Sequence, residues 1–164
     1  MILITTAGKV GAEAARLLAQ RGEPVRVLVR DPEKATALAQ AGADVAVGDL
    51  DVPATIDAAM RGISAVVLVS PAIPAQELNV VASAAGAGAG HVVKITSKAS
   101  ADSPIARRRD QTEIENGLIG SVALADRCAW QSALTRMTGC QMTIVSWSNA
   151  ARIRWRAGTS VASS

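Results

Sequence analysis

Five short apolar segments alternate with segments of helical periodicity along the chain, and this alternation constrains the fold more than any other feature. The apolar segments are residues 2–4, 25–29, 44–47, 65–69 and 91–96. Apolar spacing, glycine stops and prolines at first helical positions predict helices between them. Apolar strands that are joined by helical crossovers form a parallel sheet buried on both faces. The predicted fold is a doubly wound, Rossmann-like α/β sheet of five strands.

A glycine-bearing turn follows the first apolar segment. The residues expected to form it are Thr6, Gly8, Lys9, Val10 and Gly11. A strand that turns into a helix directs backbone N–H groups and the positive end of the helix dipole toward a phosphate. Thr5 stands where a dinucleotide-binding turn has its leading glycine, and a β-branched residue does not adopt positive φ cheaply, so this turn is expected to differ. An ordinary strand-to-helix turn, which also favours glycine, is the alternative.

Polar and loop residues follow the next strands at the edge where such sheets bind ligands. The residues expected at this edge are Arg30, Lys34, Asp49, Leu50, Val69, Ser70 and Pro71. A site for NAD(H) usually has an acid at the end of the second strand, whereas a site for NADP(H) has an arginine there. Arg30, with Lys34 one turn later, favours NADP(H). Asp31 could itself bond the ribose and leaves NAD(H) open, and a solvated arginine before a helix is the alternative for Arg30.

Composition excludes several other classes of protein. No apolar run approaches the ~20 residues that cross a bilayer, and no basic leader precedes the first strand, so a cytoplasmic protein without membrane contact is expected. Cys128 and Cys140 have no histidine beside them, which predicts neither a disulfide framework nor a metal site.

The chain changes character after residue 120. From Ser121 onward there are five arginines and one aspartate, a net charge of +4 in a chain of +3 overall, so the rest has no basic stripe for nucleic acid. We expect a nucleotide-binding domain over residues 1–120 and an atypical basic tail over 121–164, partly disordered, above all at 157–164. Residues 141–145 are predicted to form a strand. The basic and aromatic run at 152–156 keeps nucleic-acid contact as an alternative.

Four phrases of the sequence carry a family resemblance: residues 25–34, 48–51, 57–62 and 91–94. In this order and spacing they resemble the NmrA-like, atypical short-chain dehydrogenases, including NAD(P)H:quinone oxidoreductase-like enzymes, over residues 1–118. The resemblance implies that the Gly8 and Gly11 turn holds the pyrophosphate, with Arg30 and Lys34 near the 2′-phosphate. It also implies that Asp49 and Leu50 lie beside the adenine, and residues 69–71 toward the nicotinamide.

The sequence departs from the family pattern in three places. The turn lacks its leading glycine, and residues 107–113 have arginines where relatives have Arg-Trp-His. After Gly120 the resemblance stops, and the expected substrate-binding lobe is absent. A reading-frame shift in the codons of residues 125–132, or truncation, is our hypothesis for this change. A sheet without its last strands would expose an edge, so self-association is expected.

Three functions fit these observations. The first is hydride transfer from NADPH to a small electrophile such as a quinone, with the dinucleotide and a small-molecule substrate as partners. The chain has no tyrosine, which excludes a Tyr-x-x-x-Lys proton relay, and no catalytic residue is identified: Lys94 and Lys98 lack an evident acid partner, and His91 is interpreted as structural. The alternatives are an NAD(P)-sensing regulator without turnover and an inactive remnant.

Overall fold

A computed structural model describes the backbone of residues 1–96, 99–124, 130–137 and 140–147, and the side chains of residues 1–95 and 99–118. Its strands are β1 (Ile2–Ile4), β2 (Val25–Val29), β3 (Asp44–Val47), β4 (Ala65–Leu68), β5 (His91–Thr96), β6 (Trp130–Met137) and β7 (Cys140–Trp147). Its helices are α1 (Lys9–Gln20), the 3-10 helix η1 (Pro32–Ala35), α2 (Thr36–Gln40), α3 (Pro53–Ala59), α4 (Pro74–Gly86) and α5 (Ala106–Leu124).

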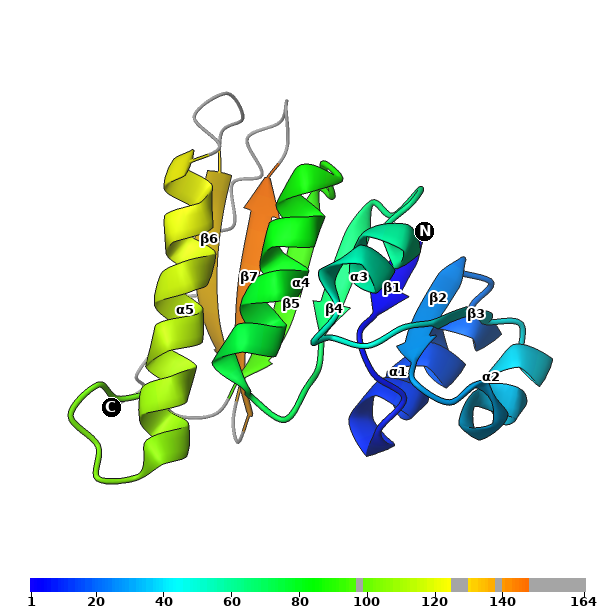
Figure 1. Ribbon diagram of the computed structural model, residues 1–164, viewed down its shortest axis with the longest axis horizontal. Coiled ribbons are helices and arrows are strands. Elements are labelled where there is room, and N and C mark those ends of the chain that lie inside the picture. Colours follow the sequence, from blue (N-terminus) through cyan, green and yellow to red (C-terminus); the bar gives the residue numbers. More distant parts are fainter. Residues whose placement is uncertain (97–98, 125–129, 138–139, 148–164) are drawn as a thin grey trace, which may run out of the picture.

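The strands form one sheet in the order β3-β2-β1-β4-β5-β7-β6. Strands β1 to β5 are all parallel, which confirms the predicted five-strand α/β sheet. The chain moves outward from β1 to β3 on one side and then from β4 to β5 on the other. The strand order therefore reverses between β1 and β4, the place where open α/β sheets bind ligands. The parallel strands point toward the lower side of Figure 1.

Helices cover the parallel strands on both faces because neighbouring strand residues point to opposite sides. Leu3 belongs to a buried cluster with residues of α3, α4 and α5, such as Ile56, Val80 and Ile114. Ile4 belongs to a second cluster with residues of α1, η1 and α2. In Figure 1, α3, α4 and α5 lie in front of the sheet. This burial on both faces explains why the strands are apolar throughout.

The sheet continues past β5, which corrects one expectation. Strand β7 pairs antiparallel with the whole of β5, from His91 opposite Ser146 to Thr96 opposite Gln141, and β6 pairs antiparallel with β7. The predicted open edge at β5 is therefore wrong. The chain passes from α5 to β6, the outermost strand, and then reverses into β7, which lies between β6 and β5. Antiparallel strands such as β6 and β7 need no helical crossover between them. The predicted strand at 141–145 lies within β7.

Other expectations about the tail stay predictions. The disorder expected at residues 157–164 and the basic run at 152–156 lie outside the described residues. The division of the chain at residue 120 also stays a prediction, and helix α5 continues past this point to Leu124. No helix in the described ranges is long and apolar enough to span a membrane.

Candidate functional site

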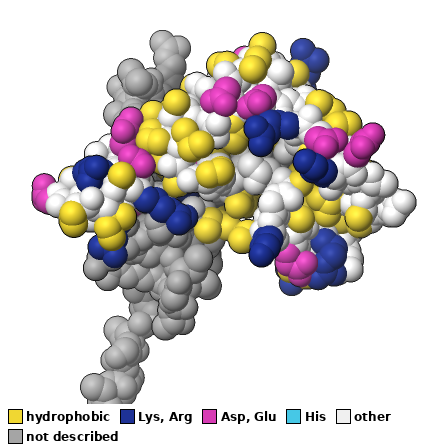
Figure 2. Space-filling model, turned by 60° about the horizontal axis from the view of Figure 1, so that its bottom comes forward, with side chains coloured by type: hydrophobic (Ala, Val, Ile, Leu, Met, Phe, Trp, Pro, Cys, Tyr) yellow, Lys and Arg dark blue, Asp and Glu magenta, His cyan; other side chains and the backbone are white. Residues whose placement is uncertain are grey.

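A cavity of about 450 Å³ lies at the carboxyl ends of the first strands, where the strand order reverses. Figure 2 brings this edge forward and shows dark blue Lys and Arg side chains beside yellow apolar ones. The predicted site residues that line the cavity are Thr6, Gly8, Arg30, Lys34, Asp49, Leu50 and Pro71. The remaining ones do not line it: Lys9 and Val10 are exposed in the first turn of α1, Gly11 is buried, and Val69 and Ser70 are half-buried after β4.

Gly11 lets helix α1 approach the strand that precedes it. A Cβ atom at this position would lie 1.9 Å from the backbone oxygen of Thr6 and 3.3 Å from Cγ2 of Ile4. Any side chain would therefore push the turn and the helix apart. This is the packing role of the last glycine in a dinucleotide-binding turn.

Gly8 has a different environment. It precedes α1 with extended backbone angles, φ −67° and ψ 179°, and no side chain caps the helix there. A Cβ atom on Gly8 would have Thr6 Oγ1, at 3.9 Å, as its nearest neighbour. The fold does not need glycine at this position, and the first N–H groups of α1 are left for an anion because helix starts have no intrahelical partners for them.

Thr5, at the position of the leading glycine, joins the turn to the end of β4 by side-chain hydrogen bonds. Its Oγ1 donates to the backbone oxygen of Val69 and accepts from the Val69 N–H, both at 2.9 Å. Thr6 Oγ1 donates to the same oxygen at 2.8 Å. Thr5 is 2% exposed and is not among the residues with positive φ. The turn of this chain is therefore held by side-chain hydrogen bonds from Thr5 and Thr6 to the end of β4.

Arg30 and Asp31 follow β2 with opposite roles. Asp31 Oδ1 accepts from the Glu33 N–H at 3.1 Å and caps η1, and Oδ2 lies 3.6 Å from Lys34 Nζ. The Asp31 carboxylate is thus already engaged with its own helix. Arg30 is exposed on the cavity wall, and its guanidinium has no ion-pair partner among the described residues. Of the two, Arg30 is the group available to a ligand.

The loop after β3 is held from two sides. Thr55 Oγ1 accepts from the Asp49 N–H at 3.0 Å, and Asn79 Nδ2 of α4 donates to the Leu50 backbone oxygen at 3.0 Å. A Cβ on Gly48 would lie 2.9 Å from Thr55 Cβ, so a side chain there would push the loop away from α3. Sequence reasoning missed Thr55 and Asn79, whose contacts depend on how α3 and α4 pack.

The loop after β4 leads to a buried ion pair. Ser70 Oγ donates a hydrogen bond to Glu77 Oε1 of α4, and Glu77 Oε2 forms an ion pair with Lys94 Nζ of β5. Glu77 is 0% exposed and Lys94 1%. The expectation that Lys94 lacks an acid partner is therefore wrong. The signal that could have found the pair was a charged residue in an apolar strand, because a buried lysine needs a counter-ion.

Ala72 adds backbone strain to the same loop. Its φ of 61° lies in the left-handed region, and it is the one such residue other than glycine in the described part of the chain. Its N–H points to Ser70 Oγ at 3.4 Å. Such strain persists only where surrounding contacts hold it. The hydrogen bonds of Ser70 Oγ to Glu77 and to the Ala72 N–H are contacts that can hold it here.

Glu115 of α5 gives a pH-dependent test of the packing around Lys94. Burial raises the pKa of the Glu115 carboxyl, although the Gln111 hydrogen bond and the Lys94 ammonium oppose the shift. Because the folded-state pKa is raised, the protonated carboxyl of Glu115 stabilises the fold at pH values below the ordinary pKa of 4.5. This stabilisation is lost as the pH rises through the folded-state pKa. Glu115→Gln should therefore raise the free energy of unfolding at neutral pH and leave it unchanged in acid below that value. Urea unfolding at both pH values measures this, and an equal gain at both would contradict it.

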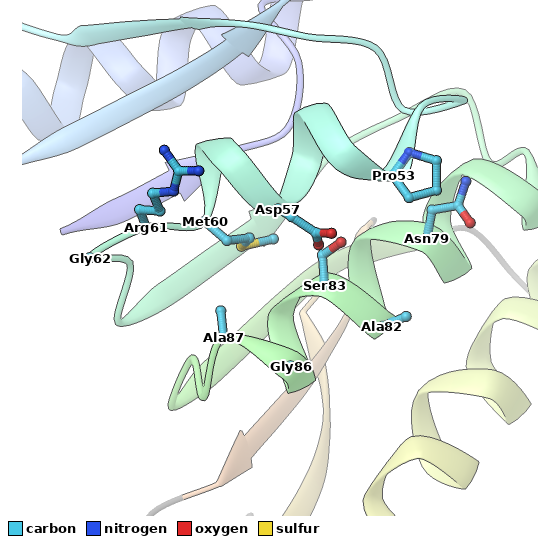
Figure 3. A pocket seen from close by; sticks show the side chains of 10 residues that line it. All are labelled: Pro53, Asp57, Met60, Arg61, Gly62, Asn79, Ala82, Ser83, Gly86 and Ala87. Carbon is cyan, nitrogen blue, oxygen red and sulfur yellow. The ribbon is translucent and has the colours of Figure 1, made fainter.

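A second cavity, of about 750 Å³, lies between α3 and α4. Figure 3 shows Asp57 of α3 and Ser83 of α4 pointing toward one another across it, with Met60 nearby. Much of the α4 side consists of small residues, Ala82, Ser83, Gly86 and Ala87. It lies on the face of the sheet that α3 and α4 cover, and none of the predicted site residues lines it. The carboxyl-edge cavity remains the candidate site.

Comparison with known proteins matches residues 6–149 to the family described as NAD(P)H-binding. The match extends past Leu118, where the resemblance by motifs ended. An NAD(P)H azoreductase of Xenophilus azovorans is 36% identical over 109 residues, which cover 64% of this chain and 38% of the azoreductase. The (4-alkanoyl-5-oxo-2,5-dihydrofuran-3-yl)methyl phosphate reductase of Streptomyces griseus is 42% identical over 120 residues, 69% of this chain and 42% of that enzyme. The chain therefore spans about four tenths of the curated relatives that it matches.

Solved structures of NADPH-dependent reductases are also similar to this chain. The Citrobacter triphenylmethane reductase complexed with NADP(H) is 27% identical, with a TM-score of 0.64 over 74% of this chain and 46% of the reductase. The NADPH-dependent quinone oxidoreductase of Escherichia coli complexed with NADPH is 31% identical, also with a TM-score of 0.64, over 74% of this chain and 45% of that enzyme.

Proposed function

Because the chain belongs to the NAD(P)H-binding family, we propose that its carboxyl-edge cavity binds NADPH and that the protein transfers hydride from it to a small electrophile such as a quinone. The observation that carries the proposal is the uncapped start of α1 beside Gly8, at the rim of the cavity that Arg30 also lines. This combination offers N–H groups to a pyrophosphate and a cation to a further phosphate. Relatives that are themselves reductases support the hydride-transfer part.

The dinucleotide would lie along the strand ends. The pyrophosphate takes the first N–H groups of α1, including those of Lys9 and Val10. The adenine lies beside Asp49 and Leu50, whose loop is fixed by Thr55 and Asn79. The nicotinamide lies toward the loop formed by residues 69–71. In this arrangement the cofactor supplies the hydride, and the chain binds and orients it.

Arg30 is proposed to favour NADP(H) over NAD(H), because a guanidinium matches the 2′-phosphate that only NADP(H) carries. Arg30→Ala should weaken NADPH binding about 10- to 100-fold, the loss of hydrogen bonds to a charged group, and leave NADH binding unchanged. Calorimetric titration with both cofactors measures this. Arg21→Ala, which removes an exposed arginine at the other end of α1, is the matched control. An equal loss for both cofactors would contradict the assignment of Arg30.

Turnover distinguishes the enzyme from its alternatives. NADPH consumption is followed by absorbance while a quinone is added under nitrogen. Oxidation that depends on both protein and quinone supports the reductase. Binding of NADPH without oxidation would instead favour the NAD(P)-sensing regulator, and absence of binding would favour the inactive remnant.

Two further expectations go with this function. A small-molecule substrate is the proposed second partner, and the cytoplasm the proposed location. Self-association also stays a prediction, but it no longer rests on β5, since β7 covers that edge and the outer strands of the sheet are β3 and β6. Light scattering of the purified protein tests it.

A further inference from the structure

A chain of polar contacts runs into the core of the protein from the loop after β4, in which Pro71, next to Ser70, lines the candidate cavity. It begins at Ser70, in the half-buried loop after β4, passes through Glu77 of α4 and ends at Lys94 of β5. Glu77 and Lys94 are both buried, and Glu77 Oε2 has no polar partner besides the Lys94 ammonium in the described part of the chain. Three elements that meet behind the carboxyl edge are thereby linked.

The ion pair sets the direction of the Ser70 hydrogen bond. A carboxylate has no hydrogen to give and only accepts, and a lysine ammonium only donates. Glu77 is paired as a carboxylate with the Lys94 ammonium, so the Ser70 hydroxyl must donate its single hydrogen to Glu77. Toward any other group Ser70 Oγ is left as an acceptor, with two lone pairs, one of which faces the Ala72 N–H at 3.4 Å.

Stability alone does not explain such a pair. Burying two charges removes their hydration, and an apolar pair of similar size often leaves a protein as stable or more so. The elements that carry the pair, α4 and β5, also supply Val80 and Val92 to the buried apolar cluster. What the ion pair adds is a fixed orientation for Ser70.

We infer that Glu77 and Lys94 are positioning residues that hold the Ser70 hydroxyl as a hydrogen-bond acceptor, and that this acceptor selects a ligand with an N–H donor, the carboxamide NH₂ of the nicotinamide. The inference rests on the proposed binding of NADPH with its nicotinamide toward residues 69–71. It adds a hydrogen-bond polarity to that end of the site, because Ser70 accepts a hydrogen bond from the ligand and does not donate one. A ligand that presents only a carbonyl oxygen to Ser70 meets a second acceptor and gains no hydrogen bond.

Glu77→Gln tests the polarity because an amide can reverse it. The glutamine oxygen is expected to turn to the Lys94 ammonium, and its NH₂ then donates to Ser70. Ser70 is thereby free to donate to a ligand. The two probes are NADPH and its reduced 3-acetylpyridine analogue, in which a methyl group replaces the carboxamide NH₂ and only the carbonyl acceptor remains.

The wild-type protein should bind NADPH about two- to tenfold more tightly than the analogue, the effect of one neutral hydrogen bond. Glu77→Gln should abolish or reverse this ratio, as measured by calorimetric titration of both ligands. Ser70→Ala removes the acceptor but keeps both members of the Glu77–Lys94 ion pair, and it should also abolish the ratio, which keeps the test decisive if Glu77→Gln fails to fold. Glu113→Gln, an exposed glutamate on α5, is the control and should keep the wild-type ratio.

Two results would overturn the inference. If the wild-type protein does not distinguish the ligands, or if both variants keep its ratio while binding of both ligands weakens equally, Glu77 has a structural role only. If the wild-type protein binds neither ligand, the proposed function itself fails and the inference with it. Binding of NADPH by the wild-type protein separates these two failures.

Discussion

Gly11→Ala is expected to destabilise the protein by about 2–3 kcal/mol, at the upper end of the usual penalty for overpacking, and to abolish NADPH binding. The added Cβ would lie 1.9 Å from the Thr6 backbone oxygen. Backbone cannot rotate aside as a side chain can, so α1 or the turn must move. The turn is also bonded to Val69 through Thr5 and Thr6, which limits how far it can yield. Urea unfolding and calorimetric titration with NADPH measure the two effects.

Gly8→Ala provides the contrast, because its Cβ would have no neighbour closer than 3.9 Å. This variant should keep the wild-type stability but bind NADPH at least about tenfold more weakly, since the methyl group would stand where the pyrophosphate is proposed to approach the helix start. If Gly11→Ala were as stable as the wild type, the close packing of α1 on the turn would be wrong. If Gly8→Ala bound NADPH normally, the proposed position of the pyrophosphate would be wrong.

Lys94→Met should lower the free energy of unfolding by about 3–5 kcal/mol, because it leaves the buried Glu77 carboxylate without a counter-ion. Both side chains are at most 1% exposed, so water cannot replace the lost partner. The double variant Lys94→Met with Glu77→Leu removes both charges and should recover most of the lost stability. Urea unfolding of the two variants measures this recovery.

Lys34→Met is the matched surface control for stability. Lys34 lies 3.6 Å from Asp31 and is largely exposed, and pairs of this kind contribute only about 0–1 kcal/mol. A Lys94→Met variant no less stable than Lys34→Met would show that the buried pair contributes nothing to holding α4 against β5.

The parallel part of the fold could be predicted from local patterns. Apolar segments bounded by glycine and proline locate β1 to β5, because each strand is buried on both faces and its composition reports this directly. The end of β4 differs slightly, at Leu68 instead of residue 69. Strands β6 and β7 were harder, because pairing of β7 with β5 depends on the chain returning between β5 and β6, which no local pattern specifies.

The candidate site was predictable where residues follow strand ends directly. Arg30, Asp49 and Pro71 line one cavity because the carboxyl ends of parallel strands meet at one edge. That they bind a cofactor stays a prediction. The Ser70, Glu77 and Lys94 contacts were not predictable in the same way, since they depend on the rotation of α4 about its axis and its distance from β5. The left-handed conformation of Ala72 was also missed, because alanine carries no signal for it.

The most direct test of NADPH binding at the carboxyl edge is to titrate NADPH into ¹⁵N-labelled protein and follow the backbone amide signals by NMR. The largest shifts are expected at residues 6–8, 30–31, 34 and 49–50, which line the cavity at the reversal of strand order, and at residues 9–11 in the first turn of α1. Absence of shifts, or shifts confined to the groove between α3 and α4, would contradict the account.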